Sequence, residues 1–145
     1  MLKGIPAALS PQMLKALCEM GHGDTLVLAD GNFPAESMGK NSMVIRADGL
    51  GVLELLEGIL QLFPLDTYVP APVSLMALVP GDTVQTPIWG HIEECIQAVD
   101  PRGANAVRHV ERFAFYEEAQ KAYAVIATGE KALYANVILQ KGVVI

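Results

Sequence analysis

The sequence is poor in charged residues and in cysteine, and each shortage excludes a class of protein. Charged side chains make up 18% of the 145 residues, against about 25% in typical soluble domains. Two cysteines are too few for a disulfide scaffold, and because no CxxC pair is present we expect Cys18 and Cys95 to be buried thiols in a reducing compartment. A hydrophobic share of 52% excludes a disordered chain, and the lack of a glycine period excludes collagen.

Long apolar runs and an excess of positive charge are missing as well. Glu54 and Glu57 interrupt the most apolar stretch, Leu50 to Phe63, and the first ten residues lack the apolar core of a signal peptide. Ten Lys and Arg against sixteen Asp and Glu give a net charge of -6, which repels a phosphate backbone. We therefore expect a cytoplasmic protein that binds neither membranes nor nucleic acid.

The signatures of several enzyme classes are also absent. The chain has no GxxxxGK[ST] loop, no GxGxxG after its first strand, no GxSxG elbow and no HExxH pair. The wide spacing of His22, His91 and His109 leaves a three-histidine metal site geometrically possible, but nothing local supports one. The sequence therefore predicts neither a metal site nor a cofactor.

What the chain does contain is an alternation of helices and strands along residues 1–145. This pattern predicts a single α/β domain with three layers, α/β/α, around a mixed sheet. The low charge leaves little polar material to coat a monomer, so we also expect oligomer contacts. Capping residues and apolar spacing predict helices at 10–21, 50–63, 86–99 and 113–121, and strands at 25–30, 43–45, 74–79, 106–110, 123–128 and 134–139, the last two joined like a hairpin.

The segment 21–34, GHGDTLVLADGNFP, is the most informative part of the sequence. Glycines flank His22 on both sides, so we expect its imidazole to be exposed at a cleft. An imidazole has an ordinary pKa of about 6.5, so it can give and take protons at cellular pH and suits general acid–base catalysis. The alternative is a histidine that caps the carboxyl end of the preceding helix.

Asp30 ends the first predicted strand, where ligand-facing residues of open α/β sheets lie. Its carboxylate can accept hydrogen bonds from two sugar hydroxyls. It can instead form an Asx turn with Gly31 and Asn32. Asp66 and Tyr68, in LDTYVP, have the same two interpretations, a contact with a ligand or a local turn.

Polar aromatic residues are concentrated between residues 112 and 142. Tyr134 and Asn136 are two residues apart in a predicted strand, so we expect both on one face and Ala135 on the other. A sugar site needs this mixture, because a ring face covers C–H groups while a hydroxyl and an amide read hydroxyls. Taken alone, such a pair of residues is more often a case of ordinary strand packing.

Six segments resemble one known family over nearly the whole chain. They are similar to the L-fucose mutarotase family, whose sister group is the D-ribose pyranase family, and the RFAFYE and IRADG stretches resemble the fucose branch more. Ala135 stands where fucose members often have glycine and ribose members alanine. The segments are GHGD (21–24), DGNFPAESMG (30–39), IRADG (45–49), LDTYVP (65–70), ERFAFYEEAQKAYAVIATGE (111–130) and LYANVILQKGV (133–143).

The resemblance implies the ribose pyranase/fucose mutarotase fold and a homo-oligomeric ring, usually a decamer. It also implies a cofactor-free mutarotase that acts on a monosaccharide, L-fucose or a related aldose. The proton donor of the family falls on His22. The sugar-contacting positions fall on Asp30, Asp66, Arg112, Tyr116, Tyr134 and Asn136.

The reaction explains why two proton-transfer groups are sufficient. Ring opening requires a proton on the ring oxygen while the anomeric hydroxyl loses one, after which the aldehyde rotates and closes on its other face. His22 would protonate the ring oxygen, and Tyr134, or Asp30 through water, would serve the anomeric hydroxyl. A sugar-binding module without turnover, a structural ring-forming protein and a ribose pyranase-type activity remain as alternatives.

Overall fold

The computed structural model describes the whole chain, residues 1–145. Helices and strands alternate, and none of the helices combines the length and apolar character that a membrane span requires. The elements are α1 (Pro11–Glu19), β1 (Thr25–Ala29), α2 (Ala35–Met38), β2 (Met43–Ala47), α3 (Val52–Leu60), β3 (Val73–Met76), α4 (Pro87–Gln97), the 3-10 helix η1 (Gly103–Ala106), β4 (Val107–Val110), α5 (Arg112–Gln120), β5 (Ala124–Thr128) and β6 (Val137–Gln140).

The six strands form one sheet in the order β2-β5-β1-β6-β3-β4. β6 pairs antiparallel with β1 and β3, whereas the other neighbouring pairs are parallel. Because β6 runs against its neighbours, the residue that precedes it lies where β1 and β3 end. We call that side, with Asp30 and Asn136, the carboxyl end of the sheet, and the opposite side, with Asp66 and Gln140, the amino end.

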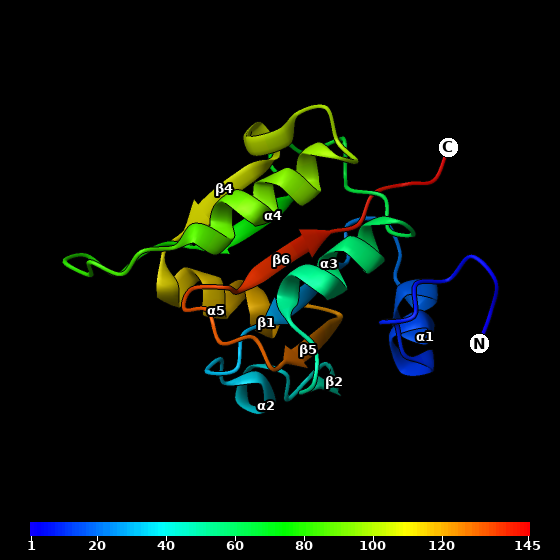
Figure 1. Cartoon of the computed structure of the whole chain (residues 1–145), viewed down its shortest axis with the longest axis horizontal. Helices are drawn as coiled ribbons and strands as arrows, with labels where there is room; N and C mark the ends of the chain where they lie inside the picture. The colour runs from blue at the N-terminus through cyan, green and yellow to red at the C-terminus, as the bar shows by residue number, and fades with distance from the viewer.

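Alternate residues of the central strands are buried in two apolar cores. In β1, Leu26 and Leu28 are fully buried in the core formed with α1, α3 and α4, whereas Val27 and Ala29 are fully buried in the core formed with α2 and α5. Figure 1 shows α3 and α4 lying across the sheet. The predicted three-layer α/β/α architecture with a mixed sheet is therefore confirmed.

Two helix starts were predicted from a hydroxyl residue followed by proline, and only one is capped. The Ser10 hydroxyl accepts the backbone N–H of Met13 at 3.2 Å. Thr86 makes no capping hydrogen bond, since its backbone (φ -121°, ψ 60°) does not direct the side chain over the helix end. α4 still begins at Pro87, whose ring fixes a helical φ.

The predicted hairpin between residues 123–128 and 134–139 is wrong. β1 separates β5 from β6 in the sheet. β6 begins only at Val137, because Tyr134 adopts a left-handed backbone (φ 58°) that cannot continue a strand. The predicted loop 31–39 also contains a short helix, α2.

The prediction that both cysteines are buried is wrong as well. Cys18 is exposed, and Cys95 is only partly buried. The buried stripe of α1 consists of Met13, Ala16 and Leu17, which follow the spacing of a single helix face. Cys18 lies just outside that stripe, so its side chain meets solvent.

Candidate functional site

At the carboxyl end of the sheet, Asp30 and Asn136 bind each other reciprocally. The backbone N–H of Asp30 donates to Oδ1 of Asn136 at 2.8 Å, and Nδ2 of Asn136 donates to Oδ2 of Asp30 at 3.1 Å. The other carboxylate oxygen of Asp30 accepts the backbone N–H of Asn32 at 3.0 Å. The Asx turn therefore forms through Oδ1 of Asp30, while Oδ2 of Asp30 binds Asn136.

Burial raises the pKa of Asp30 above its ordinary value, because the charged form is desolvated. Hydrogen bonds from Asn32, Ala135, Phe33 and Asn136 offset this rise only in part. Asp30 is 6% exposed, so it is a shielded carboxyl group with an enhanced affinity for a proton.

Tyr134 lies in the loop before β6 and is fixed on both sides. Its hydroxyl donates to the carboxylate of Asp82 and accepts the backbone N–H of Val79 at 3.4 Å. Its carbonyl oxygen accepts the indole N–H of Trp89 at 2.9 Å. The hydrogen bond to Asp82 raises the pKa of Tyr134 and lowers the pKa of Asp82, so in the free protein the proton of this pair lies on the tyrosine.

Asp82 and Trp89 are the residues that sequence reasoning missed here. Asp82 lies on the segment between β3 and α4, which reaches out beyond the sheet in Figure 1. The Pro80-Gly81 turn, with Gly81 at φ 87°, is the only local signal that this segment folds back. Nothing in the sequence marks a contact with Tyr134, about fifty residues further on.

Arg112 and Tyr116 reach the same place from the start of α5. The carboxylate of Glu111 caps this helix by accepting the N–H groups of Phe113 and Ala114 at 2.9 and 3.1 Å. One turn apart, Arg112 donates from Nε to the hydroxyl of Tyr116 at 3.2 Å, and its guanidinium lies 5.6 Å from the centre of that ring. The helix therefore presents a cation together with an aromatic face.

These groups surround a cavity of about 250 Å3. Typical ligand pockets measure about 300–1,000 Å3, so this cavity suits a small ligand. Tyr134 and Asn136 do line one pocket as predicted, although they do so from a loop and not from one face of a strand. The predicted residues that line it are Asp30, Arg112, Tyr116, Tyr134 and Asn136.

At the amino end of the sheet, Asp66 accepts hydrogen bonds from three donors. Its Oδ2 faces Nε2 of His22 at 3.2 Å and accepts Nε2 of Gln140 at 3.0 Å. Its Oδ1 accepts the backbone N–H of Tyr68 at 2.9 Å. Burial raises the pKa of Asp66, but the hydrogen bonds from Tyr68, His22 and Gln140 outweigh it, and the pKa lies below its ordinary value.

The ionised Asp66 determines which nitrogen of the His22 ring carries the shared proton. A carboxylate only accepts hydrogen bonds, so Nε2 of His22 carries the shared proton and Nδ1 is left for another partner. The His22 side chain is 45% exposed, whereas that of Asp66 is 2% exposed. His22 thus binds Asp66 instead of capping α1, and it presents one ring nitrogen to solvent.

A single chain does not bring the two groups of predicted residues together. His22 precedes β1 and Asp30 follows it. A strand rises about 3.3 Å per residue, so the two ends of β1 are separated by roughly 17 Å. Asp30, Arg112, Tyr116, Tyr134 and Asn136 form the carboxyl-end cluster, and His22 and Asp66 form the amino-end cluster.

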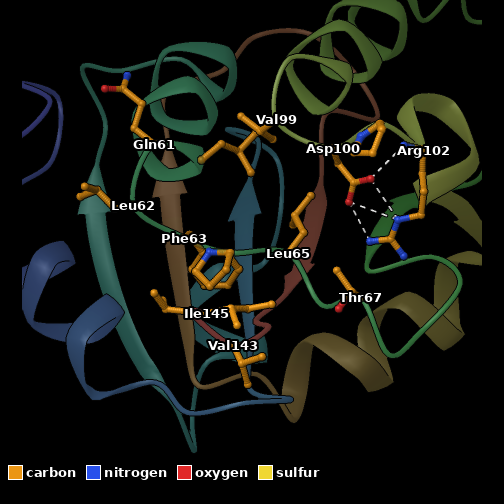
Figure 2. Close-up of a pocket in the computed structure, with 14 residues that line it drawn as sticks. Gln61, Leu62, Phe63, Leu65, Thr67, Val99, Asp100, Arg102, Val143 and Ile145 are labelled. Atoms are coloured by element: carbon orange, nitrogen blue, oxygen red, sulfur yellow. Dashed lines mark hydrogen bonds and ion pairs between the residues drawn. The ribbon is translucent and has the colours of Figure 1, made fainter.

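A larger cavity lies beside the amino-end cluster, lined by Leu65 and Thr67 on either side of Asp66. It measures about 620 Å3, and Figure 2 shows Phe63, Leu65, Val99 and Ile145 directed into it, with Asp100 and Arg102 at its rim. None of the predicted site residues lines this cavity. Its lining is largely apolar, and the Asp100 carboxylate at its rim is paired with Arg102.

The three histidines do not converge on a metal site. His91 pairs with Glu94 at 3.4 Å, and the His109 ring lies 4.6 Å from that of Trp89. No group of three or more His, Cys, Asp or Glu side chains is placed to hold a metal ion. The three-histidine site that the spacing left open does not form.

Comparisons with known proteins agree with this fold. A human fucose mutarotase is 55% identical over 98% of this chain and 94% of its own length. The crystal structure of FucU from Bifidobacterium longum shares 63% identity over 99% of this chain and 100% of that chain, with a TM-score of 0.97. The fucose mutarotase from Streptococcus pneumoniae, crystallised in complex with L-fucose, shares 46% identity over 99% of this chain and 100% of that chain, with a TM-score of 0.93.

The model of one protein family covers almost the entire sequence. It matches residues 3–144, a range that contains both clusters and all six strands. Relatives of more than 50% identity align over nearly the full length. The chain therefore belongs to the RbsD / FucU transport protein family.

Proposed function

We propose that this protein is a mutarotase that interconverts the α and β anomers of L-fucose or a closely related aldose. The relatives support this, since two of them are named fucose mutarotase and one of these was crystallised with L-fucose. The observation that carries the proposal is the His22–Asp66 pair, in which a buried carboxylate fixes an exposed imidazole. Such a pair is the usual means of orienting a general acid–base histidine.

Ring opening follows from the protons that these groups hold. Nδ1 of His22, when protonated, donates to the ring oxygen of the sugar, and the bond from that oxygen to the anomeric carbon breaks. The anomeric hydroxyl becomes the aldehyde oxygen and gives up its proton. After rotation about the adjacent C–C bond, the reverse transfers close the ring on the other face of the aldehyde and restore both groups.

Two acceptors for the anomeric proton lie in the carboxyl-end cluster. The hydroxyl of Tyr134 can accept this proton while passing its own to Asp82, with which it already shares a hydrogen bond. Asp30, whose pKa is raised by burial, is the second acceptor, through a water molecule. We assign catalysis to His22 and Tyr134, and substrate binding to Asp30, Asp66, Arg112, Tyr116, Tyr134 and Asn136.

A complete site requires two copies of the chain. The two clusters lie at opposite ends of β1, so the amino-end cluster of one copy must meet the carboxyl-end cluster of its neighbour. Such a head-to-tail contact generates a ring when the rotation between copies closes, and we propose a homo-oligomer, a decamer by resemblance. Light scattering should return a multiple of 15.5 kDa, and a monomer mass at micromolar concentration would contradict the two-copy site.

Saturation-transfer NMR on equilibrating L-fucose tests the function directly. The protein should accelerate exchange between the two anomer signals, and treatment with a chelator should leave the rate unchanged. A sugar-induced shift without faster exchange would favour a binding module. No shift at all would favour a structural protein.

The remaining assignments are proposals of the same kind. We regard residues 1–145 as one domain, because both clusters depend on the same six-stranded sheet. We place the protein in the cytoplasm, a reducing compartment in which the unpaired Cys18 and Cys95 stay reduced. Exchange measured over a panel of aldoses, ribose included, would establish the preferred sugar.

A further inference from the structure

Arg102 occupies a turn after α4 and is held there by Asp100. Nη2 of Arg102 donates to Oδ2 of Asp100 at 2.7 Å, and Nε donates to Oδ1 at 3.0 Å. The backbone N–H of Arg102 also donates to Oδ1 of Asp100 at 2.9 Å. The side chains of Asp100 and Arg102 are 8% and 26% exposed, so the guanidinium is fixed in direction and mostly shielded from water.

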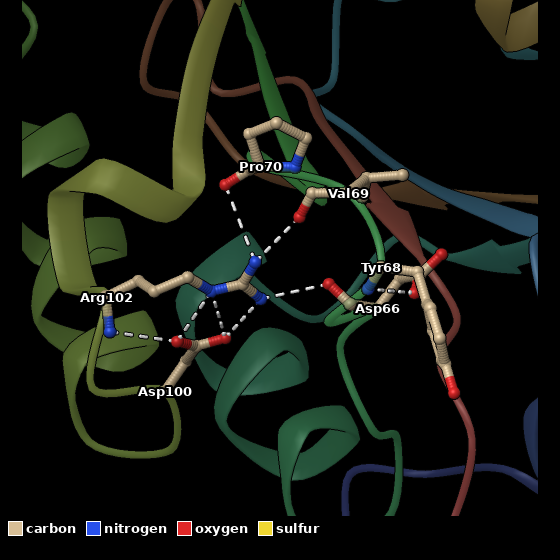
Figure 3. A network of polar contacts seen from close by, with 6 residues as sticks. All are labelled: Asp66, Tyr68, Val69, Pro70, Asp100 and Arg102. Atoms are coloured by element: carbon tan, nitrogen blue, oxygen red, sulfur yellow. Dashed lines mark hydrogen bonds and ion pairs between the residues drawn. The ribbon is translucent and has the colours of Figure 1, made fainter.

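The donors that remain on this guanidinium all reach one loop. Figure 3 shows the carbonyl oxygens of Asp66, Val69 and Pro70 turned toward Arg102. The distances are 2.9 Å from Nη2 to Asp66, 2.7 Å from Nη1 to Val69 and 3.5 Å from Nη1 to Pro70. The guanidinium of Arg102 therefore binds three backbone carbonyls of residues 66–70 at once.

The other side of the same loop touches His22. The carboxylate of Asp66 faces Nε2 of His22, and the Tyr68 ring lies 5.3 Å from the His22 ring, centre to centre. The loop has no regular secondary structure of its own. Its position depends on Arg102 on one side and on the backbone N–H of Asp66, which donates to the Gln140 carbonyl at 3.1 Å, on the other.

We propose that Arg102, fixed by Asp100, is a positioning residue that holds Asp66 where it orients His22. Arg102 itself does not meet the sugar in this assignment. The inference rests on the mutarotase activity proposed above, because it assigns Arg102 a part in that reaction. Without the guanidinium the Asp66 carbonyl loses a fixed donor, and the carboxylate can move away from the imidazole.

Substitution of Arg102 should lower the catalytic rate more than the sugar affinity, because it frees Asp66, which orients His22 and is also assigned to substrate binding. A displacement of about 1 Å in a catalytic group can reduce a rate by about 100-fold, so we expect Arg102→Ala to reduce kcat by roughly 10- to 100-fold. Arg102→Lys should give an intermediate rate, because lysine keeps the charge but not the planar fork that reaches several carbonyls. If Arg102→Ala does not fold, the Lys variant alone carries the test.

Arg108→Ala is the matched control. Arg108 also joins elements through its guanidinium, with Nε donating to Ser74 Oγ at 2.9 Å and Nη2 to Glu118 at 2.6 Å. Neither of these hydrogen bonds involves the loop 66–70. A loss of kcat as large in Arg108→Ala as in the Arg102 variants would show a general effect of removing an arginine and would overturn the proposal.

A double variant separates positioning from stability. If Arg102 acts through Asp66, then Arg102→Lys should change the rate little once Asp66→Asn has removed the carboxylate. Effects that multiply in the double variant would overturn the proposal, because they mean that Arg102 acts by another route.

A measurement without sugar keeps this test independent of the proposed function. The ring signals of His22 in NMR spectra of the free protein should move in Arg102→Lys toward their positions in Asp66→Asn, and they should stay in place in Arg108→Ala. Unmoved His22 signals in the Arg102 variant would contradict the positioning role, whatever the activity is. Absence of anomer exchange in the wild-type protein would instead refute the mutarotase assignment.

Discussion

Two buried aspartates at opposite ends of β1 have similar hydrogen-bond partners but opposite pKa shifts. Asp30 and Asp66 each accept the backbone N–H of the residue two positions on, at 3.0 and 2.9 Å. Each also accepts a side-chain amide from the β6 region, Asn136 for Asp30 and Gln140 for Asp66, at 3.1 and 3.0 Å. Yet the pKa of Asp30 is raised and the pKa of Asp66 is lowered.

His22 is the partner that one aspartate has and the other lacks. Burial is the largest influence on the pKa of both carboxyl groups. At Asp30 burial outweighs the hydrogen bonds, whereas at Asp66 the hydrogen bonds from Tyr68, His22 and Gln140, together with the charge of His22, outweigh burial. Asp66 is therefore suited to fix a proton-carrying ring, and Asp30 is suited to take up a proton. In the proposed reaction the two ends supply complementary acid–base groups, and this is the reason for proposing that both meet the same sugar.

The largest effect on activity should come from removing His22, the imidazole that binds Asp66 and has no counterpart beside Asp30. His22→Gln should reduce anomer exchange by about 10²- to 10⁴-fold, the range for loss of one general acid–base group. The fold should persist, since the His22 side chain is 45% exposed. Exchange rates and circular dichroism of the variant provide the measurement, and normal exchange in a folded variant would remove His22 from the mechanism.

Removing the side-chain amide of Asn136 at the carboxyl end, or of Gln140 at the amino end, should show that the two ends differ in sugar binding. Asn136→Ala removes the amide assigned to sugar binding, and a sugar hydroxyl left unpaired in a desolvated site costs about 1–3 kcal/mol. Sugar binding should weaken by roughly 5- to 150-fold on that scale. Gln140→Ala, the matched control, should cost less, because Oδ2 of Asp66 keeps His22. Equal losses of affinity, measured by titration calorimetry, would contradict this account of the carboxyl end.

Loss of the Tyr134 hydroxyl should affect turnover and not binding. Tyr134→Phe keeps the ring and the left-handed backbone but removes the hydrogen bond to Asp82. Turnover should fall by about 10²-fold, the lower limit for a proton-transfer group, while fucose affinity stays close to that of the wild type. A loss of affinity with normal turnover would make Tyr134 a binding residue only, and no change in either would remove it from the site.

The pH dependence of stability should show the smallest effect, with opposite signs at the two ends. The lowered pKa of Asp66 means that its contribution to stability is present above its unfolded pKa of about 3.9 and is lost as the pH falls through the folded value. For Asp30, with a raised pKa, stability is highest below about pH 3.9 and falls as the pH rises through the folded value.

Urea unfolding of Asp30→Asn and Asp66→Asn between pH 3 and 7 measures both slopes. Relative to the wild type, Asp30→Asn should gain stability as the pH rises above about 4, whereas Asp66→Asn should recover toward the wild type below about 4. Slopes of the same sign in the two variants would mean that the two carboxyl groups do not differ as described.

The sequence predicted well whatever depends on local patterns. The serine–proline cap of α1 and the apolar alternation of β1 are short-range signals, and both elements form where expected. The position of Asp30 at the end of a strand and the exposure of His22 between glycines follow from the same kind of reasoning.

Non-local geometry was beyond the sequence patterns. Nothing in residues 123–139 indicates that β1 lies between β5 and β6, or that Tyr134 turns left-handed against Trp89. The contact between Asp66 and His22 joins positions 44 residues apart. For the same reason, the sequence patterns could not predict that the site residues divide between the two ends of β1.

Complementation between two defective chains tests the central claim, that each site combines the amino-end cluster of one copy with the carboxyl-end cluster of another. His22→Gln and Asn136→Ala damage different clusters, so chains of the two variants, unfolded and refolded together, should form neighbouring pairs in which about one quarter of the sites carry neither change. Anomer exchange should then rise well above the rate of either variant alone, to about one quarter of the wild-type rate. Refolded mixtures no more active than the separate variants, in oligomers shown to contain both chains, would contradict the two-copy site.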